Sequence, residues 1–152
     1  MVYRSSNKLK LNSDKTTEII FNISHHGSPV NTSRMFLGLY VESSLGWLTH
    51  VNHVSSKIST GVYMLRMLRA SFVYYAHIHS HMSYGLLFWD NHGITNRVFK
   101  LQKRAIRTIS GDSQRTHCRP LFTKHRILTL YSMYVLSCLV YIKRNITNYD
   151  IQ

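Results

Sequence analysis

Apolar side chains recur at three- and four-residue spacing from Leu48 to Leu68, and this period constrains the fold more than any other feature. Residues at this spacing share one face of an α-helix, so the segment is predicted to be a helix with one buried face. Gly61 lies within the stripe and marks a weak point or a join between two helices. The stripe consists of Leu48, Val51, Val54, Ile58, Val62, Leu65 and Leu68.

Two segments before the stripe have the composition of β-strands. Residues 16–24, TTEIIFNIS, and 35–43, MFLGLYVES, are rich in β-branched and aromatic residues, which strands favour. Gly27 and Pro29 lie between the two segments and indicate a turn. We therefore expect a short hairpin, or adjacent strands of a small sheet.

Helices are predicted again over 72–89, 95–109 and 127–144. A length of 152 residues suits one domain with a real core. The predicted fold class is α+β and mostly α, with a short N-terminal β part over 1–47 and a helical bundle over 48–152.

The chain is strongly basic, with 19 Lys and Arg against 6 Asp and Glu and a formal charge of +13. Such an excess attracts polyanions, so nucleic acid or an anionic membrane surface is the expected class of partner. Most of the excess lies between residues 97 and 126, where Asp112 is the sole acid.

The helix predicted over 95–109 concentrates this charge on one face, an arc of about 120° at 100° per residue. Apolar residues fill the opposite side, and Gly111 is predicted to end the helix. No acid within the helix pairs with the cations, as would be usual for a merely solvated face, so we favour binding to nucleic-acid phosphates without reading of bases. The basic face consists of Arg97, Lys100, Lys103, Arg104 and Arg107.

Neither a metal site nor a catalytic site is predicted. His77, His79 and His81 recur at every second position, but residue 78 is Ile, where a helical zinc motif needs Glu. His117 precedes Cys118, yet no Asp or Asn is placed to orient it as a base. The six acids are scattered, which disfavours chemistry based on two metal ions. We expect structural histidines and cysteines, no metal and no cofactor.

Residues 127–142, ILTLYSMYVLSCLVYI, carry no charge and are followed by Lys143 and Arg144. As a helix they would span about 24 Å, less than the hydrocarbon core of a bilayer, about 30 Å. A buried helix is the preferred interpretation, and a small basic membrane-associated protein anchored by 127–142 is the alternative.

An intracellular location, in the cytoplasm or nucleus, is expected. The first residues, MVYRSSNKLKLN, lack the apolar core of a secretory signal. Two cysteines are too few for a disulfide framework, so reduced thiols are predicted.

Several segments, taken in order, resemble the C-terminal part of the reverse transcriptase of jockey-like non-LTR retrotransposons. NKLKLNSDKTTEIIF (7–21) is similar to motif D of that family, and FLGLYVESSLGW (36–47) to the strand segment that follows, with Glu42 where Asp is usual. IHSHMSYGLLFW (78–89), RVFKLQKRAIRTISG (97–111) and CRPLFTKHRILTL (118–130) are similar to segments downstream of the palm. The resemblance covers nearly the whole chain.

The resemblance implies a fragment: the end of the palm over 1–47, then a thumb-like helical bundle and linker over 48–152. The family's catalytic aspartates lie upstream of motif D, so no catalysis is expected unless another polypeptide supplies them. The join at Ala70–Val73 is shorter than is usual in the family.

The resemblance also implies roles for individual residues. Lys15 matches the motif D lysine, a general acid in an intact polymerase and vestigial here. Phe36, Leu37 and Gly38 match the primer-grip strand. The basic residues of 97–107 would follow the phosphates of RNA or an RNA/DNA hybrid, and no small-molecule substrate is implied.

Overall fold

A computed structural model describes residues 16, 19–21, 32–90 and 93–146. The described chain is mostly helical with one two-stranded hairpin, which confirms the predicted α+β, mostly α class. The strand predicted over 16–24 falls largely outside the described residues, and residues 16 and 19–21 have no regular secondary structure. Lys15, Gly27 and Pro29 also lie outside the described residues.

The hairpin pairs β1 (Ser33–Phe36) with β2 (Leu39–Glu42) in antiparallel register, with Phe36 opposite Leu39. Leu37 and Gly38 form the two-residue turn, and both have positive φ, 46° and 80°, as the turns favoured in hairpins require. The prediction of one continuous strand over 35–43 was therefore wrong, because the chain reverses at its centre. The Tyr84 hydroxyl donates a hydrogen bond to the Leu37 carbonyl and so anchors the turn.

Helix α2 (Leu48–Leu68) begins beside this hairpin. The buried Glu42 accepts a hydrogen bond of 2.6 Å from the Thr49 backbone N–H, and a carboxylate is favourable at the positive N-terminal end of a helix. Of the two alternatives at Gly61, a weak point or a join between two helices, the join is wrong, because α2 is unbroken. A methyl group on Gly61 would lie 2.6 Å from Cγ1 of Ile78, so the glycine permits close packing of two helices.

The segment predicted as a single helix over 72–89 has one break. Before the break, α3 (Ser71–Val73), the π-helical η2 (Tyr74–His79) and α4 (Ser80–Ser83) follow one another directly, and α5 (Leu86–Trp89) comes after it. The break falls at Tyr84 and Gly85, where Gly85 has φ 62° and lies against the Leu39 side chain. At the short join Ala70–Val73, Ala70 is extended and the first helical turn comes directly after it.

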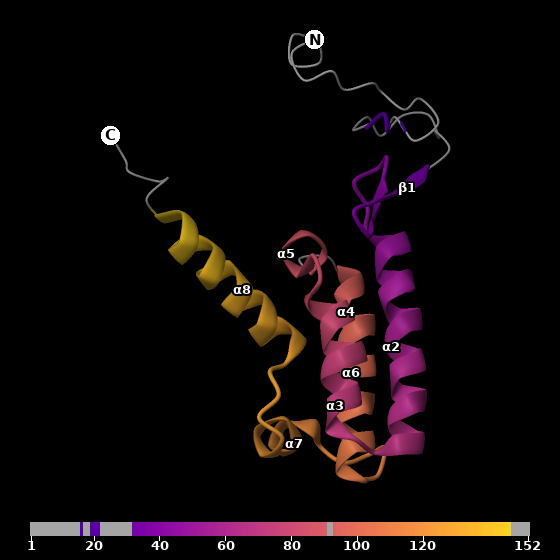
Figure 1. The fold of residues 1–152 in the computed structure, drawn as a ribbon, viewed down its shortest axis with the longest axis vertical. Coiled ribbons are helices and arrows are strands. Elements are labelled where there is room, and N and C mark those ends of the chain that lie inside the picture. Colours follow the sequence, from indigo (N-terminus) through magenta and orange to yellow (C-terminus); the bar gives the residue numbers. More distant parts are fainter. Residues whose placement is uncertain (1–15, 17–18, 22–31, 91–92, 147–152) are drawn as a thin grey trace, which may run out of the picture.

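A 3-10 turn, η3 (Gly93–Thr95), leads into α6 (Asn96–Ser110), which ends at Gly111 as predicted. Gly111 has the left-handed conformation. The short helix α7 (Cys118–Lys124) was not predicted. Helix α8 (Leu130–Asn145) begins at Thr129, whose hydroxyl accepts a hydrogen bond from the Ser132 backbone N–H. Helices α2, η2 and α6 pack side by side, whereas α8 diverges from this bundle (Figure 1).

The prediction of a buried helix over 127–142 was wrong. In α8 only Leu130 and Met133 are buried, and large apolar side chains such as Val135 (55% exposed) and Leu139 (59% exposed) face outward. An uncharged run of this length has the same sequence signature whether or not neighbours cover it. Among the described residues no helix is long and apolar enough to cross a membrane.

The core lies between α2, η2, α4 and α6, and Gln102 is the one buried amide among the residues that the structure describes. Its Nε2 donates to the Tyr74 hydroxyl and to the Leu128 carbonyl, both at 2.9 Å. Its Oε1 accepts from the Leu130 backbone N–H, also at 2.9 Å. One side chain therefore joins η2, α6 and the start of α8.

Replacing Gln102 with Met keeps the volume and removes all three hydrogen bonds. Because buried partners are then left unsatisfied, we expect the free energy of unfolding to fall by about 3 kcal/mol. Tyr74→Phe removes one of these bonds and should cost about 1 kcal/mol. Urea unfolding monitored by circular dichroism measures both changes. Equal losses in the two variants would contradict a three-way role for Gln102.

Candidate functional site

The basic face of α6 is divided into two rows by the elements that pack beside it. Arg97, Lys100 and Arg104 are exposed and line a groove against α2, whereas Lys103 and Arg107 are half-buried and face α7. The prediction from 100° per residue thus placed these cations on the side of the helix that is not buried. It could not show that one row borders α2 and the other borders α7.

The first hollow, the α2–α6 groove, has a volume of about 390 Å³. The Arg97 Nη1 donates a hydrogen bond of 2.7 Å to Asn52 Oδ1, and this bond joins α6 to α2 across the groove. Three serines of α2 face the cations, and the buried Ser55 hydroxyl has no hydrogen-bond partner among the described residues. Hydroxyl donors beside cations are suited to phosphate oxygens. The lining consists of Asn52, Ser55, Ser56, Ser59, Arg97, Lys100, Leu101 and Arg104.

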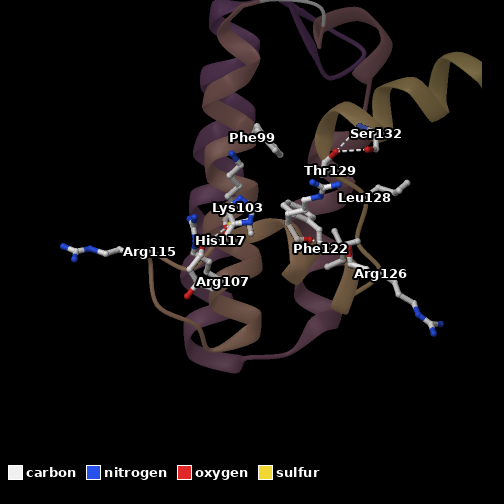
Figure 2. A pocket seen from close by; sticks show the side chains of 15 residues that line it. Phe99, Lys103, Arg107, Arg115, His117, Phe122, Arg126, Leu128, Thr129 and Ser132 are labelled. Atoms are coloured by element: carbon white, nitrogen blue, oxygen red, sulfur yellow. Dashed lines mark hydrogen bonds between the residues drawn. The ribbon is translucent and has the colours of Figure 1, made fainter.

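The second hollow, the α6–α7 pocket, is larger, about 760 Å³ (Figure 2). It combines apolar side chains with cationic ones, and none of its lining residues is acidic. Phe99, Phe122, Ile127 and Leu128 contribute the apolar part. The basic part consists of Lys103, Arg107, Arg115, His117, Arg119 and Arg126.

Two of these cations are held by contacts within the protein. The Lys103 Nζ lies 4.2 Å from the centroid of the Phe99 ring, a cation–π contact. The Arg107 Nε donates a hydrogen bond of 2.9 Å to the Thr116 carbonyl and so holds the loop before α7. Lys103, Arg107 and His117 lie close together, whereas Arg115 and Arg126 extend outward on opposite sides (Figure 2).

Four basic residues of the pocket were missed as individual site residues: Arg115, His117, Arg119 and Arg126. The sequence contained their signal, because the basic excess continues from residue 97 to residue 126. What was missing was α7, which turns this part of the chain back against α6.

The structure does not bring the predicted Phe36, Leu37 and Gly38 to the pocket. These residues lie at the hairpin beside the start of α2, and α7 lies at the opposite end of the bundle (Figure 1). Phe36 and Leu37 are exposed, and Gly38 borders a separate cavity of about 290 Å³ with His50, His53 and His81. Their shared role with the α6 cations stays a prediction.

The histidine triplet falls on the helical segment, where His77 and His81 share a face. Their ring centroids are 4.8 Å apart, and His77 Nε2 donates to the Lys57 carbonyl of α2 at 3.1 Å. His79 packs against Tyr75 instead. Within the described part of the chain, no three His, Cys, Asp or Glu residues are grouped so that they could hold a metal ion.

Comparisons with known proteins give no match: no family model, no curated protein and no solved structure is similar to this chain. The resemblance to reverse transcriptases therefore stays a prediction. Support for a function beyond that resemblance comes from the side chains and their arrangement.

Apart from the basic surface, the structure contains a buried histidine, His50. Its Nδ1 accepts a hydrogen bond of 3.4 Å from the Tyr40 backbone N–H, and its ring meets Trp47 and Trp89 edge to face. Burial, with the nearby His53, lowers the pKa of His50 to about 4. His50 is therefore neutral in the folded protein at pH 7. Burial also raises the pKa of a second group, Asp90, to about 6.

We expect acid to destabilise the fold through His50. Its folded pKa lies below the usual 6.5, so the unfolded chain binds the extra proton and stability falls as the pH drops from 6.5 towards 4. The expected loss from pH 7 to pH 4 is about 3 kcal/mol.

The raised pKa of Asp90 has the opposite effect, since stability is then lost as the pH rises from 3.8 through 6. The test therefore compares two variants that both lack the Asp90 carboxyl: the single variant Asp90→Asn and the double variant Asp90→Asn with His50→Gln. Urea unfolding at several pH values measures the free energy of unfolding of each. The glutamine can still accept from the Tyr40 N–H. An equal pH dependence in both proteins would show that His50 is not the titrating group.

Proposed function

We propose that the chain is a portion of a non-LTR retrotransposon reverse transcriptase that binds RNA or an RNA/DNA hybrid without sequence specificity. In this proposal residues 1–47 correspond to the end of the palm and 48–152 to the thumb and linker. The proposal is limited to binding and assigns no catalytic residue, and it carries the expected intracellular location, where RNA is found.

The observation that supports binding is the basic face of α6. Its five cations lie along two hollows, and α6 itself contains no acid to neutralise them. Phosphates release condensed counterions when such cations approach, which gives affinity without reading of sequence. The exposed Ser56 of α2 lines the same groove as Arg97, Lys100 and Arg104, and its hydroxyl is a further donor suited to phosphate.

Replacing Arg97, Lys100 and Arg104 with Gln should weaken binding of a labelled RNA/DNA hybrid by about 10- to 100-fold at low salt, because phosphate contacts are lost. The slope of log K against log salt should become shallower by about 2 to 3, roughly one for each lost contact. Fluorescence anisotropy across a salt series measures both quantities.

The matched control is the triple replacement of Arg66, Lys143 and Arg144 with Gln, which removes the same charge from α2 and α8. Its affinity should stay within about 2-fold of the parent, because these three residues line neither hollow and contribute only long-range attraction, which salt screens. Equal losses in both triple variants would contradict a site on α6. Absence of binding at low salt would contradict the proposed function itself.

A second candidate function comes from α8, whose exposed apolar side chains favour association with a membrane surface through residues 127–142. The helix carries Leu136 (49% exposed) and Leu139 (59% exposed) and ends in Lys143 and Arg144. An apolar face beside cations is typical of helices that lie on anionic lipid.

This candidate predicts that the protein floats with vesicles of phosphatidylcholine and phosphatidylserine. Leu136→Glu with Leu139→Glu should reduce the bound fraction by about 10-fold, because charged side chains oppose burial in lipid. The control is Tyr63→Glu with Met67→Glu, which alters exposed apolar residues of α2. Flotation that both pairs reduce equally would argue against anchoring by α8.

A further inference from the structure

The α6–α7 pocket has an excess of positive charge that the protein does not neutralise. Basic residues of α6, of the loop before α7 and of α7 line it together with Arg126, and none of its lining residues is acidic. Cations that border one pocket without an acid among them repel one another, so an anion bound there is stabilising. Arginine guanidinium groups match phosphate oxygens with paired hydrogen bonds.

The pocket is preformed rather than a gap between loose segments. Arg107 is bonded to the Thr116 carbonyl, and the Cys118 thiol contacts the Lys103 carbonyl at 3.7 Å. On the other side, Gln102 holds the Leu128 carbonyl and the Leu130 N–H. A ligand therefore need not order these walls, which favours affinity.

The floor of the pocket is apolar and partly aromatic. Phe99 and Phe122 are stacked at 6.3 Å between centroids with an interplanar angle of 22°, and Leu128 leaves 47% of its surface exposed. Inorganic phosphate would use the cations and leave this floor in contact with water. A nucleotide supplies both parts, a phosphate for the cations and a flat base for the floor.

The pocket also continues the track of cations along α6. Lys100 lines the α2–α6 groove and Lys103 lines the pocket, so the two are about 4.5 Å apart along the helix axis. A strand that runs along the groove can thus place its next nucleotide at the pocket. Bases in a duplex are stacked and paired, so only an unpaired base can reach an apolar floor.

We propose that the α6–α7 pocket binds one unpaired nucleotide of a single strand, with its phosphate at the cations and its base against Phe99, Phe122 and Leu128. The proposal rests on the proposed nucleic-acid binding and adds a preference for single strands. A volume of about 760 Å³ lies within the usual range for a small-molecule pocket, about 300–1,000 Å³.

Two labelled oligomers of about ten residues test the proposal with the full chain at fixed salt. One is oligothymidylate, and the other is an abasic strand with the same number of phosphates. The strand with bases should bind about 10-fold more tightly, because only it can fill the apolar floor. An RNA/DNA hybrid serves as the third probe and should not share this gain.

Two variants locate the contact. Leu128→Asn should reduce the preference for the strand with bases to about 3-fold, and Phe99→Leu should also reduce it. Leu136→Asn is the matched control, since Leu136 is similarly exposed but lies on α8 away from the pocket. Leu128 contributes to the fold through its backbone carbonyl, which the substitution keeps. Thermal unfolding checks that all three variants fold.

The outcomes separate the two proposals. Equal, salt-dependent binding of the strands with and without bases would overturn the nucleotide pocket and leave the proposed function standing. Failure of every probe to bind at low salt would overturn both. A preference that Leu136→Asn reduces as much as Leu128→Asn would overturn the location. Polyglutamate is tested as a competitor of oligothymidylate. If polyglutamate displaces oligothymidylate and Leu128→Asn weakens the binding of both equally, the pocket is assigned to acidic peptides instead.

Discussion

The arrangement of the helical region depends on the amide of Gln102. Apolar contacts hold α2, η2 and α6 together, but they fix direction poorly because they have no preferred geometry. The amide has three partners on two other segments, Tyr74 on one side and Leu128 with Leu130 on the other. It therefore sets where the chain leaves the core and enters α8. Glu42 has a comparable role at the far end, where it joins the hairpin to the start of α2.

The basic surface depends on this framework. Because the segment before α8 is held at Gln102, α7 lies against α6 and converts one cationic helix face into a groove and a pocket. Arg107 is part of the framework as well as of the surface, since it holds the Thr116 carbonyl. The proposed binding thus combines a track that any phosphate chain can occupy with a pocket that only an exposed base can fill.

The sequence predicted the features that depend on one buried helix face and missed those that depend on contacts between distant segments. The stripe of α2, the basic face of α6 and the helix end at Gly111 are local, and the structure contains all three, although Leu48 and Leu68 at the two ends of the stripe are exposed. The turn at Leu37 was missed because leucine rarely has positive φ. Helix α7 has seven residues, including Pro120, which is too short for a periodic pattern. The exposure of α8 and the close contact at Gly61 depend on which neighbours are present, and composition does not contain this information.

The π-helical turn at Tyr74–His79 makes the chain sensitive to changes in its length. A π-turn holds an extra residue within a helix, and here it sets which side chains meet Gly61 on α2. Because the π-turn already accommodates its extra residue, insertion of one further residue before Ile78 would rotate the downstream helical residues by about 100° relative to the upstream ones, which would move Ile78 and Met82 away from the core. A loop at the surface can accept insertions and deletions, whereas this segment ties the number of residues to the identity of the buried face.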